Sequence, residues 1–129
     1  MAERSVPALL LAAAKRDEQA FRALAAIPDM NDAVIGFHAH QCVEKALKAV
    51  LAYAGTPYRR THRIRALVEL LKERRRGSPP FSERLDELQP YAVEARYGFV
   101  EPTGFDRDMI AQIVEAVVSW AESELSVLR

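Results

Sequence analysis

The chain has 129 residues, half of them apolar, and its 18 lysines and arginines balance 18 aspartates and glutamates. This length and composition predict one soluble domain over residues 1–129, and the charge balance excludes an overall field that would attract nucleic acid or membranes. The single cysteine excludes an internal disulfide and any multi-cysteine zinc site, and it favours the cytoplasm as the compartment.

An apolar run near the N-terminus predicts neither a signal peptide nor a membrane span. The run extends from Val6 to Ala14, and charged residues follow it at once without a cleavage pattern. A stretch of this length is too short to cross a bilayer. We therefore expect no association with membranes.

The first half of the chain predicts two long helices. Apolar residues recur at helical spacing over residues 6–26 and again over residues 32–54, and no alternating strand pattern occurs. Ser5 is a suitable N-cap for the first helix. Gly55 suits the left-handed turn that ends the second.

The second half predicts further helical segments separated by breaker residues. A third helix begins near Ile64 and ends at the arginines 74–76. A fourth begins near Phe81 and is broken or restarted by Pro90, which leaves a short terminal piece through Arg96.

The last helix is expected over residues 105–128 and carries a broad apolar face. This face is wider than one apolar stripe because it includes Val117, Val118 and Trp120. These residues form either a dimer surface or part of the monomer core. Long helices joined by short loops pack antiparallel. The predicted fold class is therefore all-α: an up-and-down bundle of four long helices plus a short fifth helical segment.

Two histidines and a cysteine lie close together in the second helix and raise the question of a metal site. Because each helical residue turns by about 100°, His38 and His40 point about 200° apart and cannot share one ion. His38 and Cys42 share a face, but two ligands without a third make a poor site. We expect no metal and no cofactor, with Cys42 buried and the histidines at the edge of the core.

A polar arc follows the apolar face of the same helix and consists of Gln41, Glu44, Lys45 and Lys48. One interpretation is a solvated surface with a helical ion pair between Glu44 and Lys48. The other is an ordered polar stripe that binds a ligand. The helical pattern by itself leaves both open.

The segment from Phe37 to Leu51, F-x-A-x-Q-C-V-E-K-A-L-K-A-V-L, resembles the second-helix signature of the HEPN family. The name of this family refers to nucleotide binding in higher eukaryotes and prokaryotes. His62 in T-H-R-I-R-A-L is similar to the opening of the family's third helix. Tyr91 and the segment 95–97 in Y-A-V-E-A-R-Y are similar to its Tyr-x-x-x-x-Arg-Tyr element. The alanine-rich final helix also fits the family.

Many HEPN proteins are metal-independent ribonucleases, and the resemblance implies an Arg-x(4–6)-His motif shared between two subunits. Arg96 stands where this arginine is expected, but residues 101–103 contain no histidine. Attack by an RNA 2′-hydroxyl needs a base and an acid, which an arginine alone does not provide. The incomplete motif therefore favours the absence of enzyme activity but leaves the question open. The alternative is a ribonuclease with a rearranged site, in which Arg96 and His62 would be the catalytic residues.

The resemblance also implies nucleotide or RNA binding, commonly beside a small nucleotidyltransferase in a toxin–antitoxin pair. The implied binding residues are Gln41, Glu44, Lys45, Lys48, His62, Tyr91, Arg96 and Tyr97. Lysine and arginine hold phosphate, and a tyrosine ring stacks on a base. We expect a homodimer that binds such a ligand, and the alternative is a catalytically silent dimeric interaction module.

Structural roles are the competing interpretation for these residues. His62 would cap its helix or bind Glu44, and Arg96 would pair with a carboxylate. The stretch Tyr58–Arg65 contains four arginines and a tyrosine, so it is either a solvated loop or a place of phosphate contact.

Overall fold

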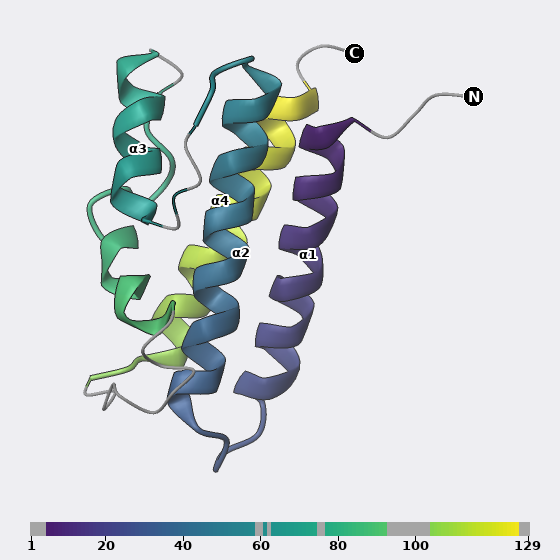
Figure 1. Ribbon diagram of the computed structural model, residues 1–129. Coiled ribbons are helices and arrows are strands. Elements are labelled where there is room, and N and C mark those ends of the chain that lie inside the picture. Colours follow the sequence, from purple (N-terminus) through teal and green to yellow (C-terminus); the bar gives the residue numbers. More distant parts are fainter. Residues whose placement is uncertain (1–4, 59–60, 62, 75–76, 93–103, 127–129) are drawn as a thin grey trace.

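The computed structural model describes residues 5–58, 61, 63–74, 77–92 and 104–126, and the regular structure in these ranges is entirely helical. The elements are α1 (Val6–Ala25), α2 (Asp32–Tyr53), α3 (Ile64–Glu73), the 3₁₀ helix η1 (Leu85–Tyr91) and α4 (Arg107–Ser126). Figure 1 shows α1, α2 and α4 side by side along the molecule, with α3 and η1 covering a flank of α2. The predicted all-α bundle of four helices and a short fifth segment is confirmed.

Local signals account for the ends of the first two helices. The Ser5 hydroxyl accepts a hydrogen bond from the Ala8 backbone N–H at 3.3 Å, as the N-cap prediction requires. The Asn31 side chain caps α2 in the same way through the Ala33 N–H at 2.7 Å. Gly55 follows α2 with a φ of 70°, the left-handed conformation that glycine adopts without strain.

The helix predicted as the fourth differs from its prediction in start and type. It begins at Leu85 instead of near Phe81, and its seven residues form a 3₁₀ helix that contains Pro90. Proline has no N–H to donate and clashes with the carbonyl one turn earlier, so a regular α-helix cannot continue through it. Arg96, where the terminal piece was expected to end, lies outside the described residues.

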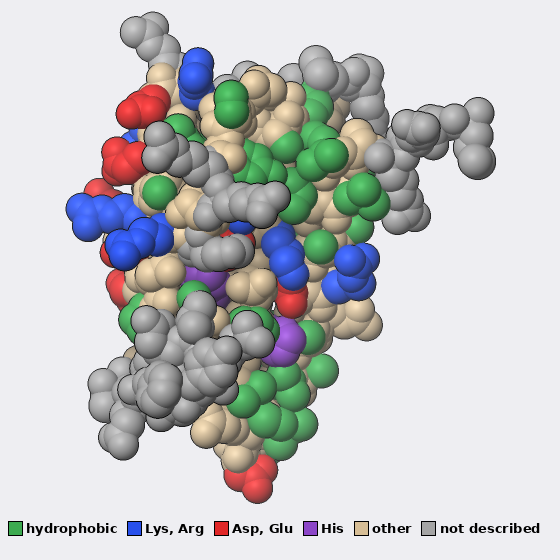
Figure 2. All heavy atoms as spheres, viewed as in Figure 1, with side chains coloured by type: hydrophobic (Ala, Val, Ile, Leu, Met, Phe, Trp, Pro, Cys, Tyr) green, Lys and Arg blue, Asp and Glu red, His purple; other side chains and the backbone are tan. Residues whose placement is uncertain are grey.

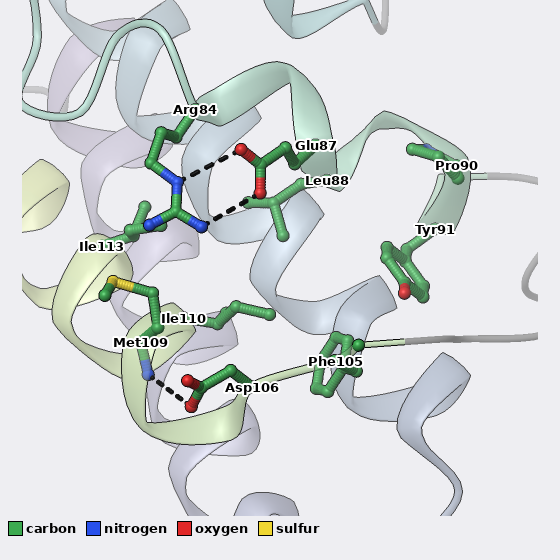
Figure 3. A pocket seen from close by; sticks show the side chains of 11 residues that line it. Arg84, Glu87, Leu88, Pro90, Tyr91, Phe105, Asp106, Met109, Ile110 and Ile113 are labelled. Carbon is green, nitrogen blue, oxygen red and sulfur yellow. Dashed lines mark hydrogen bonds and ion pairs between the residues drawn. The ribbon is translucent and has the colours of Figure 1, made fainter.

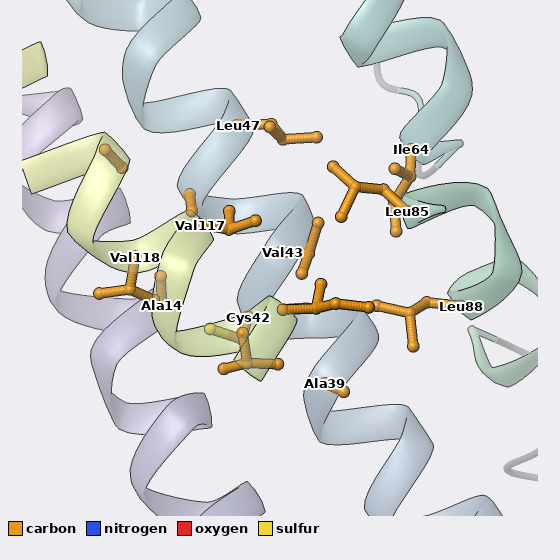
Figure 4. Close-up of a cluster of buried hydrophobic side chains, with 14 of the residues drawn as sticks. Ala14, Ala39, Cys42, Val43, Leu47, Ile64, Leu85, Leu88, Val117 and Val118 are labelled. Atoms are coloured by element: carbon orange, nitrogen blue, oxygen red, sulfur yellow. The ribbon is translucent and has the colours of Figure 1, made fainter. Parts of the chain in front are cut away.

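The hydrophobic core surrounds α2, whose apolar side chains face the three other α-helices and η1. In Figure 4, Val43 and Leu47 of α2 point toward Leu85 and Ile64, while other α2 side chains approach α4 and α1. Cys42 is fully buried, as predicted. The hypothesis of a dimer surface at Val117 and Val118 is wrong, because these side chains are 0% and 4% exposed within the monomer.

Arg107, at the start of α4, holds the turn between α1 and α2. Its guanidinium donates hydrogen bonds to the carbonyl oxygens of Ala25, Ile27 and Met30 at 2.7–3.0 Å, and it pairs with the Asp32 carboxylate at 3.0 Å. Carbonyls at the end of a helix have no partner within the helix. The Arg107 side chain therefore supplies hydrogen bonds to carbonyls at and after the end of α1, and it connects them to the first turn of α2.

Candidate functional site

The inner part of the polar arc is a buried group of charged and polar side chains on α2. Lys48 Nζ donates to Glu44 Oε2 at 2.8 Å, and the two side chains are only 11% and 5% exposed. His40 lies one turn earlier, with Nδ1 3.8 Å from Glu44 Oε1. Its imidazole is completely buried, so the expectation that both histidines lie at the edge of the core is wrong for His40.

The Gln41 amide contacts the buried histidine. Gln41 Nε2 lies 3.3 Å from His40 Nδ1. Lys48 supplies a positive charge beside the Glu44 carboxylate. Gln41 therefore lies next to the buried group as well as on the polar arc.

Tyr58 completes this part of the site from the loop after α2. Its ring centroid lies 5.7 Å from Lys48 Nζ, a distance typical of a cation–π contact. Tyr58 also lines a groove of about 640 Å³ with residues of α3, including Leu70, Glu69 and Glu73. The tyrosine thus separates the buried lysine from an open surface.

The outer part of the polar arc joins α2 to α1. Lys45 Nζ donates to Asp17 Oδ2 at 2.6 Å, and His38 Nδ1 lies 3.2 Å from Asp17 Oδ1. Lys45 and His38 are 30% and 27% exposed, so both can meet a ligand from solvent. Figure 2 shows histidine, basic and acidic side chains together in the middle of the face over α1 and α2.

Tyr91 lies away from the rest of the polar arc. Its ring packs against Gly36, where an added Cβ would lie 2.6 Å from two ring carbons, and it meets Phe105 edge-on at 5.3 Å. Gly36 and Lys48 are about 18 Å apart along the axis of α2 at 1.5 Å per residue. The structure therefore does not bring Tyr91 next to Lys48.

A cavity of about 370 Å³ lies beside Tyr91, between η1 and α4. Figure 3 shows Tyr91 and Phe105 together at one end and an ion pair between Arg84 and Glu87 at the other. Burial raises the pKa of the Tyr91 phenol, and the nearby Asp32 carboxylate raises that pKa further. Tyr91 stays neutral in the folded protein over a wider pH range than a free tyrosine.

Most of the chain matches a known protein family. The model of the HEPN domain matches residues 8–124, which is most of the chain. The chain belongs to the HEPN family. Neither the curated proteins nor the solved structures gave a match. The HEPN match places the function of this protein, at the level of the family, among activities related to nucleotides or RNA.

Several predicted site residues of this HEPN domain lie outside the described residues, namely His62, Arg96 and Tyr97. Within the described ranges, no group of three or more histidine, cysteine or acidic side chains could hold a metal ion. Burial raises the pKa of the Cys42 thiol, which keeps it protonated. No described helix is long and apolar enough to serve as a membrane span.

The sequence analysis missed two residues of the candidate site. Asp17 binds both His38 and Lys45, although it lies on a different helix. Tyr58 was noted within a basic stretch, but nothing in the sequence placed its ring over Lys48. Helical periodicity within one element cannot identify contacts between elements.

Proposed function

We propose that this HEPN-domain protein binds a nucleotide or RNA through the polar arc of α2. The observation that carries the proposal is the ion pair between Lys48 and Glu44, which is almost completely buried beside His40. Removing charges from water is unfavourable, and a buried ion pair often stabilises a fold less than apolar residues would. A buried charged cluster is therefore better explained by a role in binding than by stability.

The described residues suit separate parts of such a ligand. Lys45 is the more exposed lysine and is available for a phosphate, while Gln41 offers an amide for hydrogen bonding. Tyr58 presents an aromatic ring next to Lys48, and aromatic rings stack on unpaired bases. We propose Tyr58 as the stacking residue nearest the lysines, with His62, Arg96 and Tyr97 completing the site.

Tyr91 has a different place in this proposal. Its ring is held by Gly36 and Phe105, so we expect it to contact a ligand only where a base enters the adjacent cavity. That cavity is large enough for a planar group and has both apolar and charged lining residues.

The test is fluorescence anisotropy with a labelled 12-nucleotide single-stranded RNA, and competition with ATP, across a range of salt concentrations. Lys45→Gln should weaken binding and reduce the slope of log affinity against log salt by about one, because one phosphate contact is lost. Lys72→Gln, an equal charge change at an exposed position on α3, is the control. Equal affinities and slopes for the two variants would contradict the proposed role of Lys45.

We further propose that the protein is a homodimer in the cytoplasm and the HEPN member of a toxin–antitoxin pair with a minimal nucleotidyltransferase. Family membership and the resemblance of the motifs support this proposal. Copurification of the HEPN protein with a coexpressed nucleotidyltransferase, compared with an unrelated nucleotidyltransferase, tests it. Equal recovery with both partners would count against the pair.

A specific observation favours a catalytically silent interaction module as the second candidate. Both lysines of the polar arc are already paired with carboxylates, Lys45 with Asp17 and Lys48 with Glu44. Such a balanced surface attracts phosphate weakly. Absence of RNA and ATP binding by the wild-type protein would favour this candidate.

Ribonuclease activity with a rearranged site remains a further proposal, in which Arg96 and His62 act. Cleavage of a labelled structured RNA in EDTA, by wild type and by Arg96→Ala of matched melting temperature, distinguishes it. Cleavage lost only in the variant would support catalysis, and intact RNA with both proteins would argue against it.

A further inference from the structure

The groove beside Tyr58 combines apolar walls with acidic residues. It has a volume of about 640 Å³ and lies between the loop after α2 and one side of α3. Its walls include four apolar or aromatic residues, namely Pro57, Tyr58, Ala66 and Leu70. Among the described residues, the charged ones that line it are Glu69 and Glu73, and both are exposed. The groove is therefore apolar in its walls and negative in its charge.

The groove exists because α3 buries only one of its sides. That buried side consists of Ile64, Leu67, Val68 and Leu71. Ala66 and Leu70 lie one turn apart on a neighbouring side and are only partly buried. Helix α3 packs chiefly against α2 and η1, and Figure 1 shows it at the edge of the bundle. In the described part of the molecule, the side with Ala66 and Leu70 is therefore open to a further element.

Glu69 and Glu73 place two carboxylates one turn apart along the groove. Neither side chain forms an ion pair or a hydrogen bond with a described residue. Like charges four residues apart on a helix repel each other and destabilise it. The pair therefore does not stabilise α3 by itself, whereas a cationic partner would turn the repulsion into attraction.

Basic side chains on the neighbouring elements are engaged elsewhere. Arg65 and Lys72 of α3 line a separate hollow on the other flank of this helix, where Glu83 and Asp86 are also found. Lys48 contacts the tyrosine ring of the groove, but it is already paired with a carboxylate of its own helix. The described residues that line the groove therefore leave its negative charge uncompensated.

We propose that this groove docks an amphipathic helix of a partner protein. The apolar stripe of that helix packs on Tyr58 and Leu70, and lysines or arginines along one border of the stripe pair with Glu69 and Glu73. Four helical residues rise by about 6 Å, so basic residues at i and i+4 of the partner match the spacing of the two carboxylates. An amphipathic helix laid into an apolar groove is a recurring mode of peptide recognition.

Two other classes of partner fit the groove less well. The described residues offer no strand edge to which an extended segment could add. Carboxylates repel the phosphates of RNA, so the groove is distinct from the polar arc in the ligand that it attracts. Docking of a partner helix here therefore goes beyond the proposed binding of a nucleotide or RNA and does not depend on it.

Isothermal titration of the full chain with synthetic peptides tests the proposed occupant. The probe is a helical peptide of about 18 residues with leucines in one stripe, lysines along both borders of that stripe and alanines elsewhere. One control peptide has glutamates in place of the lysines, and a second has alanines in place of the leucines. The protein should bind the leucine–lysine peptide at least roughly 10-fold more tightly than either control, because apolar burial and charge pairing both contribute.

Two pairs of substitutions locate the binding site. Glu69→Gln with Glu73→Gln removes both carboxylates of the groove and should weaken binding of the leucine–lysine peptide roughly 10-fold. Glu83→Gln with Asp86→Asn removes the same charge on the other flank of α3 and should leave the affinity unchanged. Ala66→Phe fills the groove without a change in charge and should also weaken binding. Matched melting temperatures confirm that the variants fold.

Three results would overturn the inference. The first is a wild-type protein that binds the leucine–lysine peptide no better than the control peptides. The second is an affinity that falls equally in both pairs of variants, or in neither, since the peptide would then lie elsewhere on the surface. The third is self-association in sedimentation experiments that the Glu69→Gln and Glu73→Gln changes abolish, which would assign the groove to a second copy of this chain. None of these measurements involves RNA, so their failure is distinct from failure of ligand binding.

Discussion

Replacing Arg107 by alanine should destabilise the domain by removing one side chain that fastens three elements together. Arg107 belongs to α4, and its guanidinium binds carbonyl oxygens after and at the end of α1 as well as the Asp32 carboxylate of α2. The side chain is 23% exposed and Asp32 is 33% exposed, so water screens part of the interaction. The perturbation therefore acts on a partly buried network.

The magnitude follows from these contacts. A hydrogen bond to a charged group contributes about 1.5–3 kcal/mol, but the contributions do not add fully because the freed carbonyls regain water. We expect the free energy of unfolding to fall by about 2–4 kcal/mol. With an unfolding entropy of about 2.1 cal/mol/K per residue, each kcal/mol lowers the melting temperature of this chain by about 4 °C. The expected decrease is about 8–15 °C.

Thermal denaturation followed by circular dichroism, with urea unfolding as a second measure, is the assay. Arg107→Lys should lie between wild type and Arg107→Ala, because one ammonium group cannot reach all the same acceptors. Arg84→Ala is the control, since Arg84 forms an exposed ion pair with Glu87 within one segment. If Arg107→Ala lost no more stability than Arg84→Ala, the role assigned to the guanidinium would be refuted.

Three further predictions concern Gly36, Tyr91 and Cys42. Gly36→Ala should lower the free energy of unfolding by about 1–2 kcal/mol, because the new Cβ meets the Tyr91 ring at 2.6 Å, and an unchanged urea midpoint would contradict this. Stability should fall above about pH 10 as the unfolded state loses the Tyr91 proton before the folded state, whose pKa is raised; Tyr91→Phe should show a smaller loss between pH 9 and pH 11. Cys42 should react with a thiol reagent only after unfolding, and rapid labelling of the native protein would show that it is not buried.

The positions of the first two helices were predictable because local residue chemistry determines where a helix ends, and because apolar residues recur at helical spacing along each one. Ser5 begins the first helix because its hydroxyl caps a backbone N–H, and Gly55 ends the second because glycine adopts the left-handed conformation. The burial of Cys42 was predictable because a free cysteine behaves as a small hydrophobic residue. The motif of the second helix, read as a resemblance to HEPN domains, agreed with the family match over residues 8–124.

Alternatives that depended on contacts between helices were not decidable from the sequence. His38 and His40 are two residues apart, yet one is 27% exposed and the other is fully buried, because α1 and the rest of the bundle cover different sides of α2. Val117 and Val118 were equally suited to a dimer surface and to a core. Their place depended on how α4 packs against α2.

By itself, the sequence determined the helical class, the family and the residues that share one arc of α2, since these follow from the order of side chains along one helix. Only the tertiary structure decided which of these residues have partners. Asp17 meets His38 and Lys45 because α1 packs against α2, and Tyr58 reaches Lys48 because the loop after α2 folds back over it. Such pairs join residues far apart in the chain, and their distances depend on the packing of whole helices.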